Sequence, residues 1–240
     1  MPVPTLRDQT IVIIGGSAGM GFAVAEGALA EGAKVVIGSS QQANVDAAVA
    51  RLGAGASGAV VDVRDEASLE AFFAKIGSLD HLVFTAGDMA GFAPSTLADL
   101  DIAAAGEGLK LRFWGAIAAI KHAQPHLSAN GSIVLTDGLL AHKPMKGMPL
   151  VTAFAGASEH LVRALAVDLA PIRVNSVCPG LVLTERLAGW PAEMIAQITE
   201  RQPIPRGALP EEAAQAYLYL LRAGYTTGQV MVVDGGAMLV

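Results

Sequence analysis

Short apolar runs alternate with longer helical stretches along most of the chain. Seven runs, most of them rich in β-branched residues, predict strands at residues 11–14, 35–37, 59–61, 82–84, 133–135, 174–178 and 230–233. Most runs are continuously apolar, which is typical of parallel strands buried on both faces. Helical spacing marks residues 20–30, 43–52, 67–76, 102–127, 152–169 and 211–221. This alternation predicts a doubly wound α/β fold, with about seven parallel strands and helices on both faces of the sheet.

The alternation runs through residues 1–240 without a linker, a repeat or a low-complexity tract, so we predict one domain. It is interrupted once, between Glu185 and Pro210, where four prolines occur and no strand run is found. Such a segment after a late strand often covers the substrate side of a site. We therefore expect residues 185–210 to form a substrate lid.

Composition narrows the function classes. The 52% share of hydrophobic residues and 16% share of charged residues exclude a disordered chain. The net charge of −6 gives no electrostatic footprint for nucleic acid or an anionic membrane. Mean hydropathy is +0.48, but the stretch Gln9–Ala25 is a poor bilayer span, and the run Ile11–Ile14 is too short for a signal peptide. Cys178 is the only cysteine, and we expect an inert buried thiol in a cytoplasmic protein.

A glycine-rich turn links the first strand to the first helix. Gly15 suits a tight turn, Gly19 lets the backbone approach a pyrophosphate, and Gly21 lets the helix pack on the strand. The N–H groups and dipole of the helix N-terminus favour a phosphate there. The turn therefore predicts a dinucleotide site.

The same residues also spell the G-x-S-x-G pattern of a serine hydrolase, with Ser17 as nucleophile. That arrangement needs a histidine late in the chain, whereas the last one here is His160. We keep this reading as a remote alternative.

The second strand ends at Ser39 and Ser40 without the acidic residue that holds the ribose hydroxyls of NAD. Two hydroxyls would tolerate the 2′-phosphate of NADP, although no Arg or Lys follows them. The pattern favours NADP over NAD; the alternative is that both serines are ordinary turn residues.

Five blocks, in order and at matching spacing, resemble the short-chain dehydrogenase/reductase family. They lie at residues 15–21, 62–63, 85–87, 173–184 and 227–236. The resemblance implies a single Rossmann-like domain, NAD(P)(H) binding, and a homotetramer or dimer formed through the helices at 102–127 and 152–169. The cofactor residues that it implies are Gly15, Ser17, Gly19, Met20, Gly21, Ser39, Ser40, Asp62, Val63, Thr85, Ala86, Gly87, Pro179, Gly180, Val182 and Thr184.

The catalytic positions depart from the family's pattern. The family uses a Tyr as general acid/base, a Lys four residues later that lowers the pKa of the Tyr, a Ser and an Asn. Alignment without gaps places Val151, Ala155, Gly138 and Arg112 at those positions. The tyrosines, at 217, 219 and 225, have no Lys four residues later, so the usual pair is absent from the sequence.

Asp137 is the candidate substitute, because it follows a strand at the edge where α/β sheets bind ligands. Turn capping is its alternative role. We expect His142, Lys143 and Lys146 to be solvated loop charges, and Arg112 to pair with an acid or to bind an anionic substrate.

The sequence as a whole predicts an atypical NAD(P)-dependent oxidoreductase that acts on an unidentified small carbonyl or alcohol. It predicts no metal, nucleic-acid or membrane partner. The alternative is an NAD(P)-binding sensor or scaffold without dehydrogenase activity.

Overall fold

Seven parallel strands form one sheet in the computed structural model, which describes residues 5–87 and 96–240. The strands are β1 (Thr10–Ile14), β2 (Lys34–Ser39), β3 (Ala56–Val60), β4 (Leu79–Phe84), β5 (Leu127–Thr136), β6 (Arg173–Pro179) and β7 (Val230–Val233). Their order across the sheet is β3-β2-β1-β4-β5-β6-β7, and every neighbouring pair is parallel. The predicted doubly wound fold is confirmed.

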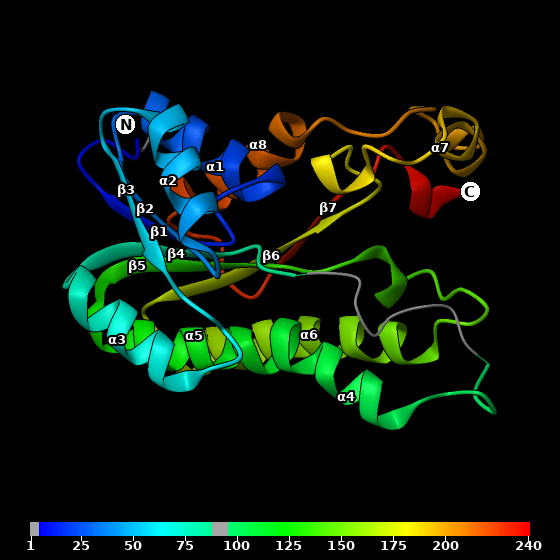
Figure 1. Cartoon of the computed structure of the whole chain (residues 1–240), viewed down its shortest axis with the longest axis horizontal. Coiled ribbons are helices and arrows are strands. Elements are labelled where there is room, and N and C mark those ends of the chain that lie inside the picture. Colours follow the sequence, from blue (N-terminus) through cyan, green and yellow to red (C-terminus); the bar gives the residue numbers. More distant parts are fainter. Residues whose placement is uncertain (1–4, 88–95) are drawn as a thin grey trace.

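Helices cover both faces of the sheet, as Figure 1 shows. Helices α1 (Gly19–Ala30), α2 (Gln42–Leu52) and α8 (Pro210–Arg222) lie on one face. Helices α3 (Glu66–Ile76), α4 (Ile102–Leu109), α5 (Gly115–Ala123) and α6 (Pro149–Asp168) lie on the other. A short helix, α7 (Ala192–Thr199), lies beyond the carboxyl end of the sheet.

The continuous apolar runs have a direct cause in this layering. Successive side chains of a strand point to opposite faces. In β1, Ile11 and Ile13 are buried in the core beneath α1 and α8, whereas Val12 and Ile14 are buried in the core shared with α3 and α5. Because both faces are covered, every position of the strand must be apolar.

The helix expected over residues 102–127 is interrupted. It breaks into α4, a π-helical turn at Lys110–Trp114, and α5, which ends at Ala123. Pro125 lies in the 3-10 turn that follows, and Leu127 already belongs to β5. A π turn inserts a residue into the helix and is often found at functional sites; here it contains Arg112.

The predicted lid contains a 3-10 turn (Glu185–Leu187) and α7 rather than irregular chain alone. An isolated parallel bridge between Val182 and Ala208 ties the two ends of this segment together. Trp190 is 41% exposed, so it does not pack in the core.

Among the described helices, α6 alone is long and apolar enough to span a membrane by length and composition. In this structure it packs against β6 and the turn after β5. Only Glu159 and Val162 of this helix are buried, so most of its apolar surface is only partly covered or open.

Candidate active site

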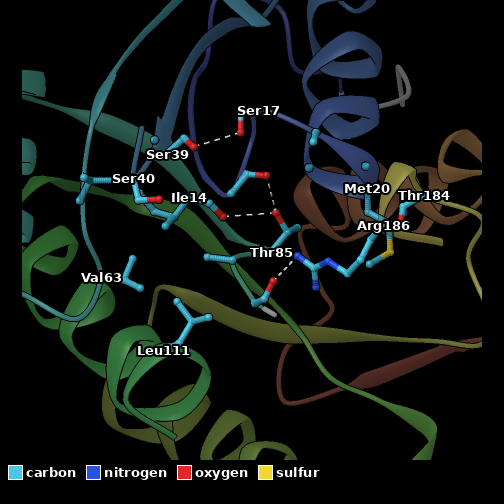
Figure 2. Close-up of a pocket in the computed structure, with 18 of the residues that line it drawn as sticks. Ile14, Ser17, Met20, Ser39, Ser40, Val63, Thr85, Leu111, Thr184 and Arg186 are labelled. Carbon is cyan, nitrogen blue, oxygen red and sulfur yellow. Dashed lines mark hydrogen bonds between the residues drawn. The ribbon is translucent and has the colours of Figure 1, made fainter. Parts of the chain in front are cut away.

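A crevice lies at the carboxyl ends of β1 and β4. After β1 the chain winds outward through β2 and β3, and then returns to β4 on the other side of β1. Open α/β sheets bind ligands where the winding reverses in this way. A cavity of about 610 Å³ opens at this point, between the glycine-rich turn, the end of β2 and the end of β4 (Figure 2).

All but three of the predicted cofactor residues line this cavity. Its wall contains Gly15, Ser17, Gly19, Met20, Gly21, Ser39, Ser40, Asp62, Val63, Thr85, Ala86, Gly87 and Thr184. The other three, Pro179, Gly180 and Val182, are not part of that wall. Pro179 pairs with β7, Gly180 lies against Asp234, and Val182 forms the bridge to Ala208.

The glycine-rich turn leaves no room for side chains. Gly15 has a φ of +91°, and a Cβ atom there would lie 2.6 Å from the backbone nitrogen of Ala86. A Cβ atom on Gly21 would lie 2.4 Å from both the carbonyl oxygen of Gly15 and Oγ1 of Thr85. The Thr85 hydroxyl donates to the Gly15 carbonyl at 3.2 Å, which fixes the turn against β4. The cavity therefore has the bare backbone cradle that a dinucleotide pyrophosphate requires.

Hydroxyl groups line the end of the cavity near β2. The Ser17 hydroxyl donates to Oγ of Ser39 at 3.1 Å, and Ser40 lies beside them (Figure 2). Ser17 is thus bonded to a serine rather than to a histidine. Arg64 also lines the cavity. Sequence reasoning missed Arg64 because it searched for a cation directly after β2, whereas Arg64 follows β3.

Two further residues that were not predicted close the cavity from the lid. The backbone N–H of Gly19 donates to Oε2 of Glu185 at 3.0 Å. Arg186 Nη2 donates to the carbonyl oxygen of Gly87, as drawn in Figure 2. Both side chains reach from the lid to residues of the cofactor wall, and only the folded chain brings them there.

A second, small cavity has one of the four positions aligned with the family's catalytic residues, Arg112, in its wall. This cavity of about 20 Å³ is lined by Arg112 and Asp137, among others. Gly138 follows Asp137, and Val151 and Ala155 lie on α6, spaced by four residues. Arg112 also lies against Gly87: its Nε atom is 3.0 Å from a Cβ atom built there. Because Gly87 lines the large cavity, Arg112 lies between the small cavity and the wall of the large one.

Asp137 directly follows β5, as predicted, and its carboxyl is largely buried. The Gly138 N–H donates to Oδ1 at 2.9 Å, so the capping role exists, whereas Oδ2 has no hydrogen-bond partner among the described residues. Burial raises the pKa of the Asp137 carboxyl from 3.8 to about 7, and the negative charge of Glu159 adds to this rise. The Gly138 hydrogen bond and Arg163 oppose it. The group can therefore exchange a proton near neutral pH.

His142 and Lys143 are exposed, as expected of solvated loop residues, but each also contacts another part of the chain. The His142 imidazole forms an ion pair with Glu159, a residue of α6 that is only 5% exposed. Lys143 donates to the Ala237 carbonyl at 2.9 Å and to that of Val240, which ties the loop to the chain end. Both partners are remote in sequence, so neither contact is visible in a local pattern. Lys146 is exposed, as expected.

Cys178 lies beside this ion pair on β6. Its sulfur, the imidazole of His142 and the carboxylate of Glu159 lie within 4.8 Å of one another. These are donor types that zinc accepts, but His142 and Glu159 are already in direct contact with each other. Burial raises the pKa of the Cys178 thiol to about 12, which keeps it protonated and inert, as predicted.

Known proteins share this architecture over almost the whole chain. Residues 15–238 match the family model described as enoyl-(acyl carrier protein) reductase. The short-chain dehydrogenase/reductase ATR9 of Stachybotrys chlorohalonatus is 37% identical over 99% of this chain and 100% of its own length. Cis-4-hydroxycyclohexanecarboxylate dehydrogenase of Sinomonas cyclohexanicum is also 37% identical, over 95% of this chain and 96% of its own.

A solved structure of a small-chain dehydrogenase in complex with NADPH superimposes with a TM-score of 0.81 at 31% identity. It covers 97% of this chain and 100% of that one. The residues matched by the family model, 15–238, include the glycine-rich turn, the switch point of the sheet and the closing strand. This chain belongs to the short-chain dehydrogenase/reductase family.

Proposed function

We propose that this protein is an NAD(P)(H)-dependent oxidoreductase in which Asp137, rather than a tyrosine, exchanges the proton with the substrate oxygen. The observation that carries the proposal is the buried Asp137 carboxyl, with its pKa near 7, in a cavity adjoining the cofactor cradle. Val151 and Ala155, which the alignment places at the Tyr and Lys positions, have no group that can hold a proton.

The nicotinamide, when bound, supplies or accepts the hydride at the substrate carbon. In reduction, the carbonyl oxygen gains negative charge and takes the proton from the Asp137 carboxyl, which becomes a carboxylate. In oxidation, the Asp137 carboxylate accepts the hydroxyl proton. The guanidinium of Arg112 lines the same cavity and stabilises the developing negative charge on oxygen.

The adenosine end of the cavity supports a preference for NADP. Ser17, Ser39 and Ser40 present hydroxyls there, and Arg64 lines the same wall. A 2′-phosphate would accept hydrogen bonds from the hydroxyls and gain an ionic contact from the guanidinium. Replacing Arg64 by Gln should weaken this preference.

Exposed apolar residues support assembly with further copies of the chain. Ile102 of α4, Trp114 of the π turn and Val167 of α6 are 79%, 59% and 81% exposed. A face of this kind on the same side of the sheet suits a helix-to-helix contact between subunits. We propose a dimer or tetramer formed through these helices, in a cytoplasmic protein that acts on a small molecule.

The proposal is tested by titrating the protein with NADPH and NADH while following cofactor fluorescence, alongside turnover on a panel of carbonyl compounds. We expect both cofactors to bind, NADPH more tightly, and reduction of at least one class of carbonyl. Binding without turnover across the panel would favour the alternative of a nucleotide-binding sensor or scaffold. No binding of either nucleotide would refute both functions.

A further inference from the structure

One face of α6 carries a buried carboxylate. Val151, Ala155 and Glu159 are spaced by four residues and therefore lie on the same side of the helix. Glu159 is 5% exposed, and its carboxylate lies within 4.8 Å of the Cys178 sulfur on β6. Asp137 lies next to Cys178, because its N–H donates to the carbonyl oxygen of Val177 at 2.8 Å. A buried carboxylate is costly unless it is paired, so its position beside a second carboxyl requires an explanation.

Two basic side chains contact the Glu159 carboxylate. His142, from the loop after β5, forms an ion pair with Oε1. Arg163, one turn further along α6, lies 3.5 Å from Oε2, with its own side chain 48% exposed. Neither partner touches the cofactor cavity. These contacts hold the negative charge of Glu159 in a fixed position, outside the wall of the nucleotide cavity.

We infer that Glu159 is a positioning residue for Asp137: its fixed negative charge, added to the burial of Asp137, favours the protonated carboxyl that can donate to the substrate oxygen. This inference rests on the proposed function. The other charged or titratable groups around Asp137 are Arg163 on α6, Cys178 on β6 and Arg112 in the π turn. Arg163 favours the Asp137 carboxylate, and the anion of Glu159 offsets this effect.

The variant Glu159→Gln tests this, because glutamine keeps the shape and can still bond His142 and Arg163. Without the anion, the pKa of Asp137 falls. The kcat/KM for reduction should then begin to fall at a pH about one unit lower than in the wild type. We expect a rate reduced about tenfold at pH 8 and a rate within about twofold of wild type at pH 5.5.

Arg163→Gln is the opposing variant. It removes a cation that favours the Asp137 carboxylate, so the falling limb should move to higher pH. Carboxyl ¹³C NMR gives the same two shifts without a substrate, with the Asp137 resonance identified by its absence from Asp137→Asn. Glu193→Gln removes one negative charge from an exposed position in the lid. It should move neither the falling limb of the pH–rate profile nor the Asp137 resonance.

The outcomes separate the two proposals. If Asp137→Asn leaves the rate unchanged, the proposed proton donor is wrong. If Asp137→Asn abolishes reduction but Glu159→Gln leaves both the limb and the resonance in place, only the role of Glu159 is overturned. A rate loss that is equal at every pH would also overturn it, because a merely structural defect acts in that way.

A second inference comes from the segment Thr184–Leu187, here called the strap. Helix α1 has no side-chain cap of its own at its N-terminus. The Gly19 N–H there instead donates to the carboxylate of Glu185, which lies 166 positions away in the chain. The cofactor cradle described above offers this N–H to a phosphate oxygen. The carboxylate thus makes the contact that a bound pyrophosphate would make.

We also infer that the strap is a latch: Glu185 competes with the pyrophosphate for the N-terminus of α1 and must swing away when a dinucleotide binds. Arg186, bonded to the Gly87 carbonyl, fastens the same strap to the end of β4. The bridge between Val182 and Ala208 provides a fixed base from which the strap can move.

Glu185→Gln removes the competing charge while it keeps the size of the side chain. We expect the Kd for NADPH and for ADP to fall about 5- to 20-fold, because a charge-assisted hydrogen bond and a repulsion both disappear. The Kd for adenosine, which has no phosphate, should stay within about twofold. Calorimetry measures all three ligands, with Glu193→Gln as the control.

Unchanged or weaker binding of ADP and NADPH by Glu185→Gln would overturn the latch. An equal gain for adenosine would overturn it as well. If neither wild type nor variant binds any of these nucleotides, the proposed function itself fails.

Discussion

Replacing Asp137 by Asn should slow carbonyl reduction by about 10²–10⁴, the usual contribution of a general acid. Asparagine keeps the shape of the side chain and its Oδ1 can still accept from the Gly138 N–H, so the turn after β5 should persist. What it lacks is a proton that can be transferred. The decline in reduction rate as pH rises through about 7 should also disappear, because the protonated carboxyl is lost only in the wild type.

The measurement is a pH–rate profile of kcat/KM with the best carbonyl of the panel. NADPH affinity is measured in parallel and should not change, because Asp137 does not line the large cavity. Asp168→Asn, an exposed change at the end of α6, is the matched control. A rate within about threefold of wild type would contradict the role of Asp137 and leave proton transfer to solvent.

Replacing Gly21 by Ala should weaken dinucleotide binding by about 100-fold. The added Cβ atom would meet the Gly15 carbonyl and the Thr85 hydroxyl at 2.4 Å, and at Gly15 the contact is with backbone, which cannot turn aside. The glycine-rich turn must then move away from β4, and its N–H groups lose their alignment on the pyrophosphate. Overpacking of this kind also lowers the free energy of unfolding by about 1–3 kcal/mol.

Gly156→Ala is the matched control, since Gly156 is also helical and a Cβ atom there meets nothing within 4 Å. It should leave NADPH affinity unchanged and should raise stability slightly through helix propensity. Fluorescence titration and thermal unfolding measure both variants. Tight NADPH binding by Gly21→Ala would show that the cofactor does not use this turn.

In the proposed mechanism, Glu159 and Asp137 together replace the electrostatics of a tyrosine–lysine pair by a reversed arrangement. A phenol titrates near 10 and needs a neighbouring cation to bring its pKa down toward neutrality. A carboxyl titrates near 4 and needs burial and a neighbouring anion to bring its pKa up. Asp137 is buried and has Glu159 as a neighbouring anion. Its pKa is therefore raised toward neutrality, whereas the pKa of a tyrosine beside a lysine is lowered toward the same range.

Local sequence patterns were sufficient for the parts of this protein that are themselves local. The continuous apolar runs predicted all seven strands, because a strand covered on both faces must be apolar at every position. The spacing of Gly15, Gly19 and Gly21 predicted the cradle, because a tight turn and close backbone approach tolerate only glycine. Neither inference requires a partner from elsewhere in the chain.

The interruption of the long helix was missed for a physical reason. Residues 102–123 have apolar positions at helical spacing throughout, and a π turn differs from an α turn by a single inserted residue. Arg112 was therefore placed on a regular helix, where pairing with an acid across an interface was the expected role. The structure instead places it beside Asp137 and Gly87.

The sequence by itself determined the doubly wound sheet, the nucleotide cradle, and the absence of any tyrosine with a lysine four residues later. Only the tertiary structure brings together the groups that we propose in place of that pair. The pKa of Asp137 depends on burial and on Glu159, and Glu159 depends on His142, which comes from another loop. The contact of Glu185 with Gly19 is equally remote in sequence. Charges act through space at distances of a few ångströms, so only the packed chain determines which of them meet.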